Sequence, residues 1–310
     1  MSLNRHRRNR VTEALVGAGI DILVCGRQDN VNYITGAHQL WTAGTRPFGP
    51  ICTLNTATGE VFLLSTWDEG IPDDIPFDHL HGITWNGSEV TRRVAATPGM
   101  ATARRVGIDS WSPGMAAMLG AVAPEAEVVP ADDALARARR TKLAGEIDAI
   151  RAACAVAAAG VAAATARAGT DTERLAAGVE AMALAGSSTP ASEPLVRGST
   201  VDFGCIRYHY EGGLSRTAGG DPELTTGLIR ACVPGATAAD LRRAAPDAGW
   251  LVRGCGMGHE PPVINSRYGT GEVLKAGMVL SVGADTGTDH RRDIVLVTES
   301  NPEILSPEAT

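Results

Sequence analysis

The sequence has no uninterrupted apolar run of about 18 residues, the length that a membrane-spanning helix needs. Its longest apolar stretches are rich in alanine and broken by glycine, so no membrane partner is expected. The basic cluster near the N-terminus lacks a following apolar core, which argues against a secretory signal. Basic residues are fewer than acidic ones, 28 against 35, so the net charge is −7 and the pI about 5.5. This balance argues against a general nucleic-acid-binding protein.

Paired cysteine motifs are absent as well. The six cysteines are scattered, and no two of them form a CxxC pair. A chain of 310 residues can build a core without disulfides, so we expect free thiols in a reducing cytoplasm. Hydrophobic residues make up 44% of the chain and charged residues 20%, which is typical of a soluble globular protein. The length allows two domains of about 150 residues each.

The first part of the chain alternates short apolar strands with helices, which indicates an α/β domain. An amphipathic helix is expected around residues 11–20, and Ser112 followed by Pro113 signals the start of another helix. We predict an N-terminal α/β domain over residues 1–137. Its expected strands lie at residues 22–25, 51–54, 61–64, 106–109 and 127–130.

The second part, residues 138–310, begins with a long alanine-rich helix and then becomes rich in strands. Thr170 and Glu173 form a capping-box pattern that starts a further helix. Strands are expected near residues 201–206, 277–282 and 294–297. One apolar stripe of the long helix, with spacings of three and four, is formed by Ile147, Ile150, Cys154, Ala157 and Val161.

Several segments, in chain order, resemble motifs of the creatinase/aminopeptidase P/prolidase family. Each segment alone is a weak signal, but their shared order across most of the chain is strong evidence. The resemblance implies an α+β chain in which a smaller creatinase-type α/β domain precedes a pita-bread catalytic-like domain, and it implies a homodimer. The matching segments are Asp29–Gly36, Arg140–Ile147, Val201–Gly204, Ser215–Thr217, Gly254–Gly258, His259–Pro262, Gly277–Leu280 and Asp293–Thr298.

Enzymes of this family usually hold two divalent metal ions with two Asp, one His and two Glu. The resemblance assigns these ligand positions to Asp202, Gly213, Cys255, Gly283 and Arg292. Only Asp202 keeps the expected ligand type. Glycine offers no side-chain ligand, and arginine places a fixed positive charge at the site. We therefore predict no metal site and no cofactor.

Four residues are candidates for catalysis without metal: Asp202, Cys255, His259 and Glu260. A histidine titrates near neutral pH, so His259 with Glu260 can transfer protons, or the pair can be a structural remnant of a turn. Cys255 can be a thiolate nucleophile with His259 or a small buried side chain. The resemblance includes creatinase, a metal-free relative that works with histidine and glutamate side chains.

The remaining candidates are for substrate binding. His209 and Glu211 would share one face of a strand, or belong to an exposed hairpin. Arg216 and Arg292 can bind a carboxylate, although Arg292 can instead pair with Asp202 or Asp285 and fill the vacated metal space. Tyr33 and His38 belong to or follow a segment that, in the family, can reach the partner subunit's active site.

Three functions fit these observations. The first is a metal-independent, creatinase-like hydrolase or lyase that acts on a small nitrogenous carboxylate. The second is a catalytically inactive relative that binds a ligand or a protein partner. The third is an Xaa-Pro aminopeptidase or dipeptidase, which would require the metal ions.

Overall fold

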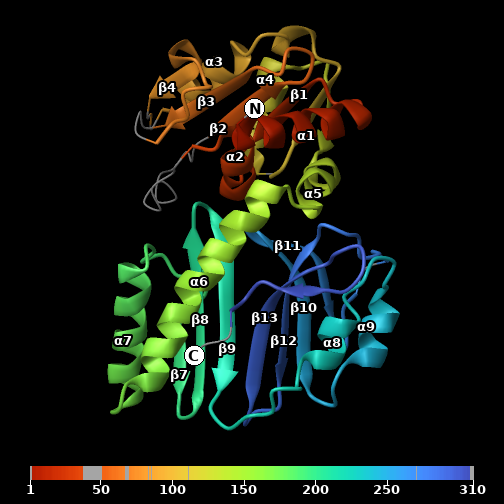
Figure 1. The fold of residues 1–310 in the computed structure, drawn as a ribbon. Helices are drawn as coiled ribbons and strands as arrows, with labels where there is room; N and C mark the ends of the chain where they lie inside the picture. The colour runs from red at the N-terminus through yellow and green to blue at the C-terminus, as the bar shows by residue number, and fades with distance from the viewer. Residues whose placement is uncertain are drawn as a thin grey trace. The chain divides into compact units, whose positions relative to one another are not determined.

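The computed structural model describes residues 2–37, 51–66, 70–82, 84, 86–110, 112–269 and 271–307. The chain divides into two compact units, an N-terminal domain over Met1–Arg139 and a C-terminal domain over Arg140–Thr310 (Figure 1). Each domain has its own sheet and its own buried core.

The N-terminal domain contains a six-stranded sheet with the order β4-β3-β2-β1-β5-β6. β2 runs antiparallel to both β1 and β3, whereas β1 is parallel to β5, β3 to β4, and β5 to β6. The predicted strands therefore exist, and they form a mixed sheet. Their bounds are β1 (Ile22–Cys25), β2 (Ile51–Asn55), β3 (Val61–Thr66), β4 (Leu80–Gly82), β5 (Arg105–Ile108) and β6 (Glu127–Pro130).

Helices pack on this sheet, and α3 and α4 contribute to one buried core with β1 and β5. α4 starts where the sequence predicts, because the Ser112 hydroxyl accepts a hydrogen bond from the Met115 amide at 3.1 Å and Pro113 occupies the first turn. The helices are α1 (Leu3–Gly17), α2 (Gln28–Thr35), α3 (Gly87–Ala95), α4 (Pro113–Val122) and α5 (Asp132–Arg140), with short 3₁₀ turns at Phe77–His79 and Met100–Thr102.

The C-terminal domain is built on an eight-stranded antiparallel sheet with the order β11-β10-β12-β13-β9-β8-β7, and β14 pairs with β13. Because every described pairing in this sheet is antiparallel, one face can be buried while the other remains open. The bounds are β7 (Leu195–Arg197), β8 (Thr200–Arg207), β9 (Tyr210–Thr217), β10 (Gly249–Gly256), β11 (Gly258–Asn265), β12 (Val279–Asp285), β13 (His290–Leu296) and β14 (Glu303–Ile304).

Helices cover one face of this sheet. α6 (Ala144–Ala166) and α7 (Asp171–Leu184) bury Val201, Phe203 and Leu214 of β8 and β9. α8 (Thr226–Arg230) and α9 (Ala238–Ala244) cover the half that contains β10 and β12 (Figure 1). Since side chains alternate along a strand, their neighbours in sequence point to the opposite face. That opposite face carries the candidate site.

α6 shows why the predicted apolar stripe is needed. Its residues Ile150, Cys154, Ala157 and Val161 are all buried. By length and composition alone α6 could span a membrane, but the stripe is accounted for by its packing on β8, β9 and α7. The capping box at the start of α7 is present as predicted.

Of the two alternatives left open for His209 and Glu211, the structure has the hairpin and not the single strand, although Glu211 is buried. Tyr208 and His209 form a two-residue turn with φ values of 50° and 71°, and Arg207 pairs with Tyr210 across it. Two-residue hairpin turns favour positive φ at both central residues, a conformation usually marked by Asn or Gly. Neither Tyr208 nor His209 is of these types. Because the chain reverses at His209, the strand alternation that grouped His209 with Glu211 is broken.

Candidate functional site

The positions that correspond to metal ligands lie on the open face of the C-terminal sheet. Arg292 of β13 pairs across the sheet with Gly283 of β12 on one side and with Ser215 of β9 on the other. Asp202 of β8 pairs in turn with Ser215. Directly opposed residues share a face, so these side chains point to the same side of the sheet. Gly213 lies two residues before Ser215 and faces the same way.

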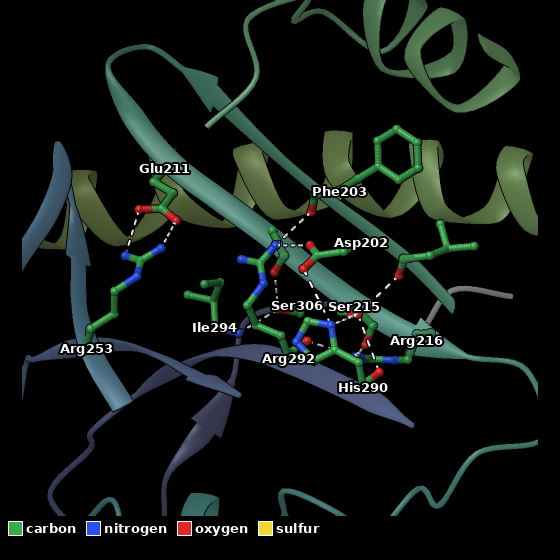
Figure 2. A network of polar contacts seen from close by, with 12 residues as sticks. Asp202, Phe203, Glu211, Ser215, Arg216, Arg253, His290, Arg292, Ile294 and Ser306 are labelled. Carbon is green, nitrogen blue, oxygen red and sulfur yellow. Dashed lines mark hydrogen bonds and ion pairs between the residues drawn. The ribbon is translucent and has the colours of Figure 1, made fainter. Parts of the chain in front are cut away.

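An ion pair fills the centre of this face. The Arg292 Nη2 donates to the Asp202 carboxylate and, at 3.2 Å, to the Phe203 carbonyl oxygen (Figure 2). A Cβ atom on Gly213 would lie only 2.7 Å from Arg292 Nη1 and 2.9 Å from Nη2. The guanidinium therefore occupies the space where an aspartate side chain at position 213 would begin. The sequence left Arg292 either to bind a substrate carboxylate or to pair with Asp202 or Asp285, and the structure shows the ion pair with Asp202.

The residues present do not fit a two-metal site. Asp202 is the only carboxylate at the assigned ligand positions, and it is engaged by Arg292. Over the described ranges, no group of three or more His, Cys, Asp or Glu side chains could hold a metal ion. A guanidinium at the centre of the site would also repel a dication.

His290 joins this ion pair, although the sequence argument did not select it. Its Nδ1 lies 3.1 Å from the Ser215 hydroxyl and 3.8 Å from the Asp202 carboxylate (Figure 2). In a Ser-His-Asp triad the hydroxyl and the carboxylate contact opposite ring nitrogens, whereas here both approach Nδ1. A triad is therefore not formed. The available signal was the position of His290 two residues before Arg292, hence on the same strand face.

A second ion pair occupies the neighbouring part of this face. Arg253 of β10 contacts both carboxylate oxygens of Glu211, with Nη1 at 2.9 Å from Oε2 (Figure 2). Glu211 is 2% exposed. The candidate nucleophile Cys255 is fully buried, and its thiol lies 3.5 Å from the Glu211 carbonyl oxygen. Burial, together with the negative charge of Glu211, raises the pKa of this thiol well above its usual value, which opposes thiolate formation.

The candidate acid Glu260 is also paired. Lys142 Nζ lies 2.6 Å from Glu260 Oε2, and both side chains are buried. His259 lies on β11, where its backbone pairs with Cys255, but its side chain lies outside the described residues. The predicted proton transfer between His259 and Glu260 therefore stays a prediction.

The other candidates lie elsewhere. Arg216 pairs with Val201, on the helix-covered face, and its Nη2 lies 2.6 Å from the buried carboxylate of Asp293. His209 occupies the turn described above. Tyr33 is buried in the N-terminal domain, where its hydroxyl donates to the Ala138 carbonyl oxygen at 3.2 Å. His38 lies outside the described residues.

A cleft of about 260 Å³ opens beside the ion pair. Its lining combines the edge of Arg292, the ring of His290 and the exposed carboxylate of Asp285 with apolar surface from Trp250 and Leu251. Arg292 uses only Nη2 for Asp202 and Phe203, and its Nε and Nη1 make no hydrogen bond to any described residue. Arg292 therefore lines the cleft with two guanidinium nitrogens that no described residue engages.

A known domain family and several solved structures resemble this chain. Residues 7–141 match the Creatinase/Prolidase N-terminal domain. The prolidase from Pyrococcus horikoshii is 21% identical with a TM-score of 0.75, covering 97% of this chain and 98% of its own. The prolidase from Pyrococcus furiosus is 20% identical with a TM-score of 0.75, covering 96% and 98%.

The Xaa-Pro dipeptidase from Bacillus anthracis is 16% identical with a TM-score of 0.75, covering 98% of both chains. At these identities the likeness establishes the fold alone. No curated protein matches the chain in sequence. The predicted family resemblance and fold class are confirmed. Residues 7–141 form a creatinase/prolidase N-terminal domain, and the chain as a whole is a two-domain protein with the pita-bread fold of the prolidases.

Proposed function

We propose that the C-terminal cleft binds a small nitrogenous carboxylate without a metal ion. The observation that carries this proposal is the Arg292 guanidinium, which lies against Gly213 and pairs with Asp202 where family enzymes hold metal. A fixed cation thus replaces the metal charge, and its Nε and Nη1 remain available to a carboxylate. Guanidinium and carboxylate groups match in geometry and form strong, charge-assisted hydrogen bonds.

The cleft also limits the size and character of the ligand. Its volume of about 260 Å³ is below the usual range for drug-sized ligands, so an amino acid, a dipeptide or a similar compound fits best. Asp285 is exposed at the rim and can pair with an ammonium or guanidinium group. Trp250 and Leu251 supply apolar surface for the body of the ligand.

Turnover by C–N hydrolysis or elimination is a second candidate, favoured by the position of His290 in the cleft. Histidine can act as a general acid or base near neutral pH. The inactive alternative is favoured by a different observation: Asp202, Glu211 and Glu260 are all paired with cations. An Xaa-Pro peptidase activity, as in the structural neighbours, would need ligands that the described residues do not supply.

Calorimetry with proline, Gly-Pro and creatine as probes tests the binding proposal. We expect at least one probe to bind metal-stripped protein, and Arg292→Lys to weaken binding about tenfold because lysine lacks the planar donor edge. Arg216→Lys is the matched control, since Arg216 lies on the opposite face, and it should leave the affinity unchanged. Stoichiometric Mn, Co or Zn in the purified protein, or Mn-stimulated hydrolysis of Gly-Pro, would overturn the proposal.

Product analysis with the same probes separates turnover from binding. If the cleft is catalytic, wild-type protein forms product and His290→Ala loses it while still binding the probe. Binding without any product identifies the inactive alternative. The predicted homodimer and cytoplasmic localisation are further proposals, for which size measurement in solution and localisation of the tagged full chain are the tests.

A further inference from the structure

The N-terminal domain has a crevice at one edge of its sheet. β1, β4 and β5 run in the same direction, so their carboxyl ends meet at this edge. α3 starts shortly after β4, and α4 starts shortly after β5. In open α/β sheets, ligands bind in crevices outside the carboxyl ends of the strands. The topology therefore places the crevice where this class of sheet accommodates ligands.

The crevice is large and carries no charged side chain among its described lining residues. Its volume is about 770 Å³, within the usual range for small-molecule sites. Gly26, which follows β1, and Ile51, which begins β2, lie at the sheet edge. Met115 and Met118 of α4 and Val90 of α3 add apolar surface. Methionine adapts to irregular shapes and makes favourable contacts with aromatic rings.

The residues that line the crevice also carry hydrogen-bond donors with no partner among the described residues. They are the backbone N–H groups of Gly87 and Gly114, in the first turns of α3 and α4, and the hydroxyls of Ser88 and Ser110. The neighbouring donors are already satisfied: the Asn86 side chain accepts from the Ser88 amide at 3.0 Å. A ligand with acceptor atoms would satisfy the remaining groups.

The charge near the crevice favours an uncharged ligand over a phosphate-bearing one. The buried carboxylate of Asp109, the residue after β5, accepts hydrogen bonds from the amides of Gly26 at 2.8 Å and Arg27 at 3.0 Å. A phosphate in the crevice would be desolvated close to this negative charge, with no lysine, arginine or histidine in the described lining. An uncharged ligand avoids this cost.

We propose that this crevice, between the first turns of α3 and α4, binds an uncharged heteroaromatic molecule. Its acceptor atoms meet the donors of Gly87, Gly114, Ser88 and Ser110, and its ring packs against Met115 and Met118. This site belongs to the N-terminal domain alone and does not depend on the function proposed for the C-terminal cleft.

The test uses the full chain with adenosine, indole and nicotinamide as uncharged probes and AMP as the charged counterpart of adenosine. At millimolar concentration, at least one uncharged probe should shift the amide NMR signals of Gly87 and Gly114. Adenosine, where it binds, should bind about tenfold more tightly than AMP. Silence of all three uncharged probes, or AMP binding as tightly as adenosine, overturns the proposal.

A filled-crevice variant tests the location. Ala117 is exposed and lines the crevice, so Ala117→Trp should reduce the affinity for the binding probe about tenfold. Gly120 lies on the same helix outside the lining, and a Cβ there meets nothing within 4 Å, so Gly120→Trp should leave the affinity unchanged. Circular dichroism of both variants checks that they are folded. Unchanged binding by folded Ala117→Trp overturns the assigned site.

Discussion

The C-terminal cleft and the N-terminal crevice differ most in the charge of the residues that line them. The C-terminal cleft is lined by Arg292, His290 and Asp285, and Arg253 adds a buried ion pair at its inner side. The N-terminal crevice has about three times the volume and no charged side chain in its described lining. On the cleft face, cations and carboxylates neutralise one another. A ligand of the cleft therefore meets charged side chains, whereas a ligand of the crevice meets none among the described lining residues.

Breaking the buried pair of Arg253 and Glu211 should have the largest effect. Arg253→Ala leaves Glu211, which is 2% exposed, without its cation. Removing one member of a buried ion pair costs about 3–5 kcal/mol, because the remaining charge is desolvated and unpaired. Urea denaturation of the C-terminal domain should show this loss of unfolding free energy.

The matched control is the exposed pair of Arg243 and Asp240, in which the side chains are 76% and 40% exposed. Arg243→Ala should cost less than about 1 kcal/mol. In the double variant Arg253→Met with Glu211→Gln, no unpaired charge remains, so much of the stability should return. An effect of Arg253→Ala no larger than that of Arg243→Ala would show that the cleft face is solvated and not buried.

The fold was largely accessible from the sequence because ordered motifs and apolar periodicity depend on local residue types. The stripe along α6 and the caps of α4 and α7 are examples. The sequence also shows directly that Gly213 and Arg292 stand at positions which the resemblance assigns to metal ligands. The side-chain arrangement was not, since the bidentate contact between Arg253 and Glu211 joins distant strands and depends on the sheet register.

The hairpin at Tyr208 and His209 was one of two alternatives, and the sequence left the choice open for a different reason. Positive φ at both positions is imposed by the hairpin geometry, although neither residue is Asn or Gly. The crevice of the N-terminal domain was also invisible, because it is created by parallel strands whose carboxyl ends meet only in the folded sheet.

An intermediate effect is expected where Arg292 lies against Gly213. Gly213→Asp places a Cβ 2.7 Å from Arg292 Nη1, so the guanidinium must move and strain of about 1–3 kcal/mol follows. Arg292→Ala removes the obstacle, and the double variant should be less destabilised than the sum of the two single variants. Urea denaturation of all four proteins in a double-mutant cycle measures this coupling. Additive effects would show that Arg292 does not occupy the side-chain space of position 213.

The smallest effect is expected for buried cysteine thiols that have no ion-pair partner, which occur in both domains. Burial raises the pKa of Cys232 in the C-terminal domain, and of Cys52 in the N-terminal domain, from 9.0 to about 12. Because the folded-state pKa lies above the unfolded one, the stability contribution is complete below pH 9.0 and is lost as the pH rises towards 12. Between these values each thiol contributes a slope of about 1.4 kcal/mol per pH unit.

Cys232→Ala should therefore flatten the alkaline decline of stability in the C-terminal domain, and Cys52→Ala should do the same in the N-terminal domain. Hydrogen exchange between pH 9 and 11, read separately from peptides of each domain, measures the two slopes. Equal changes would show that burial acts alike in both domains, so that the contrast between their hollows comes from charge pairing. An unchanged slope in either variant would mean that the corresponding thiol is not shielded from water.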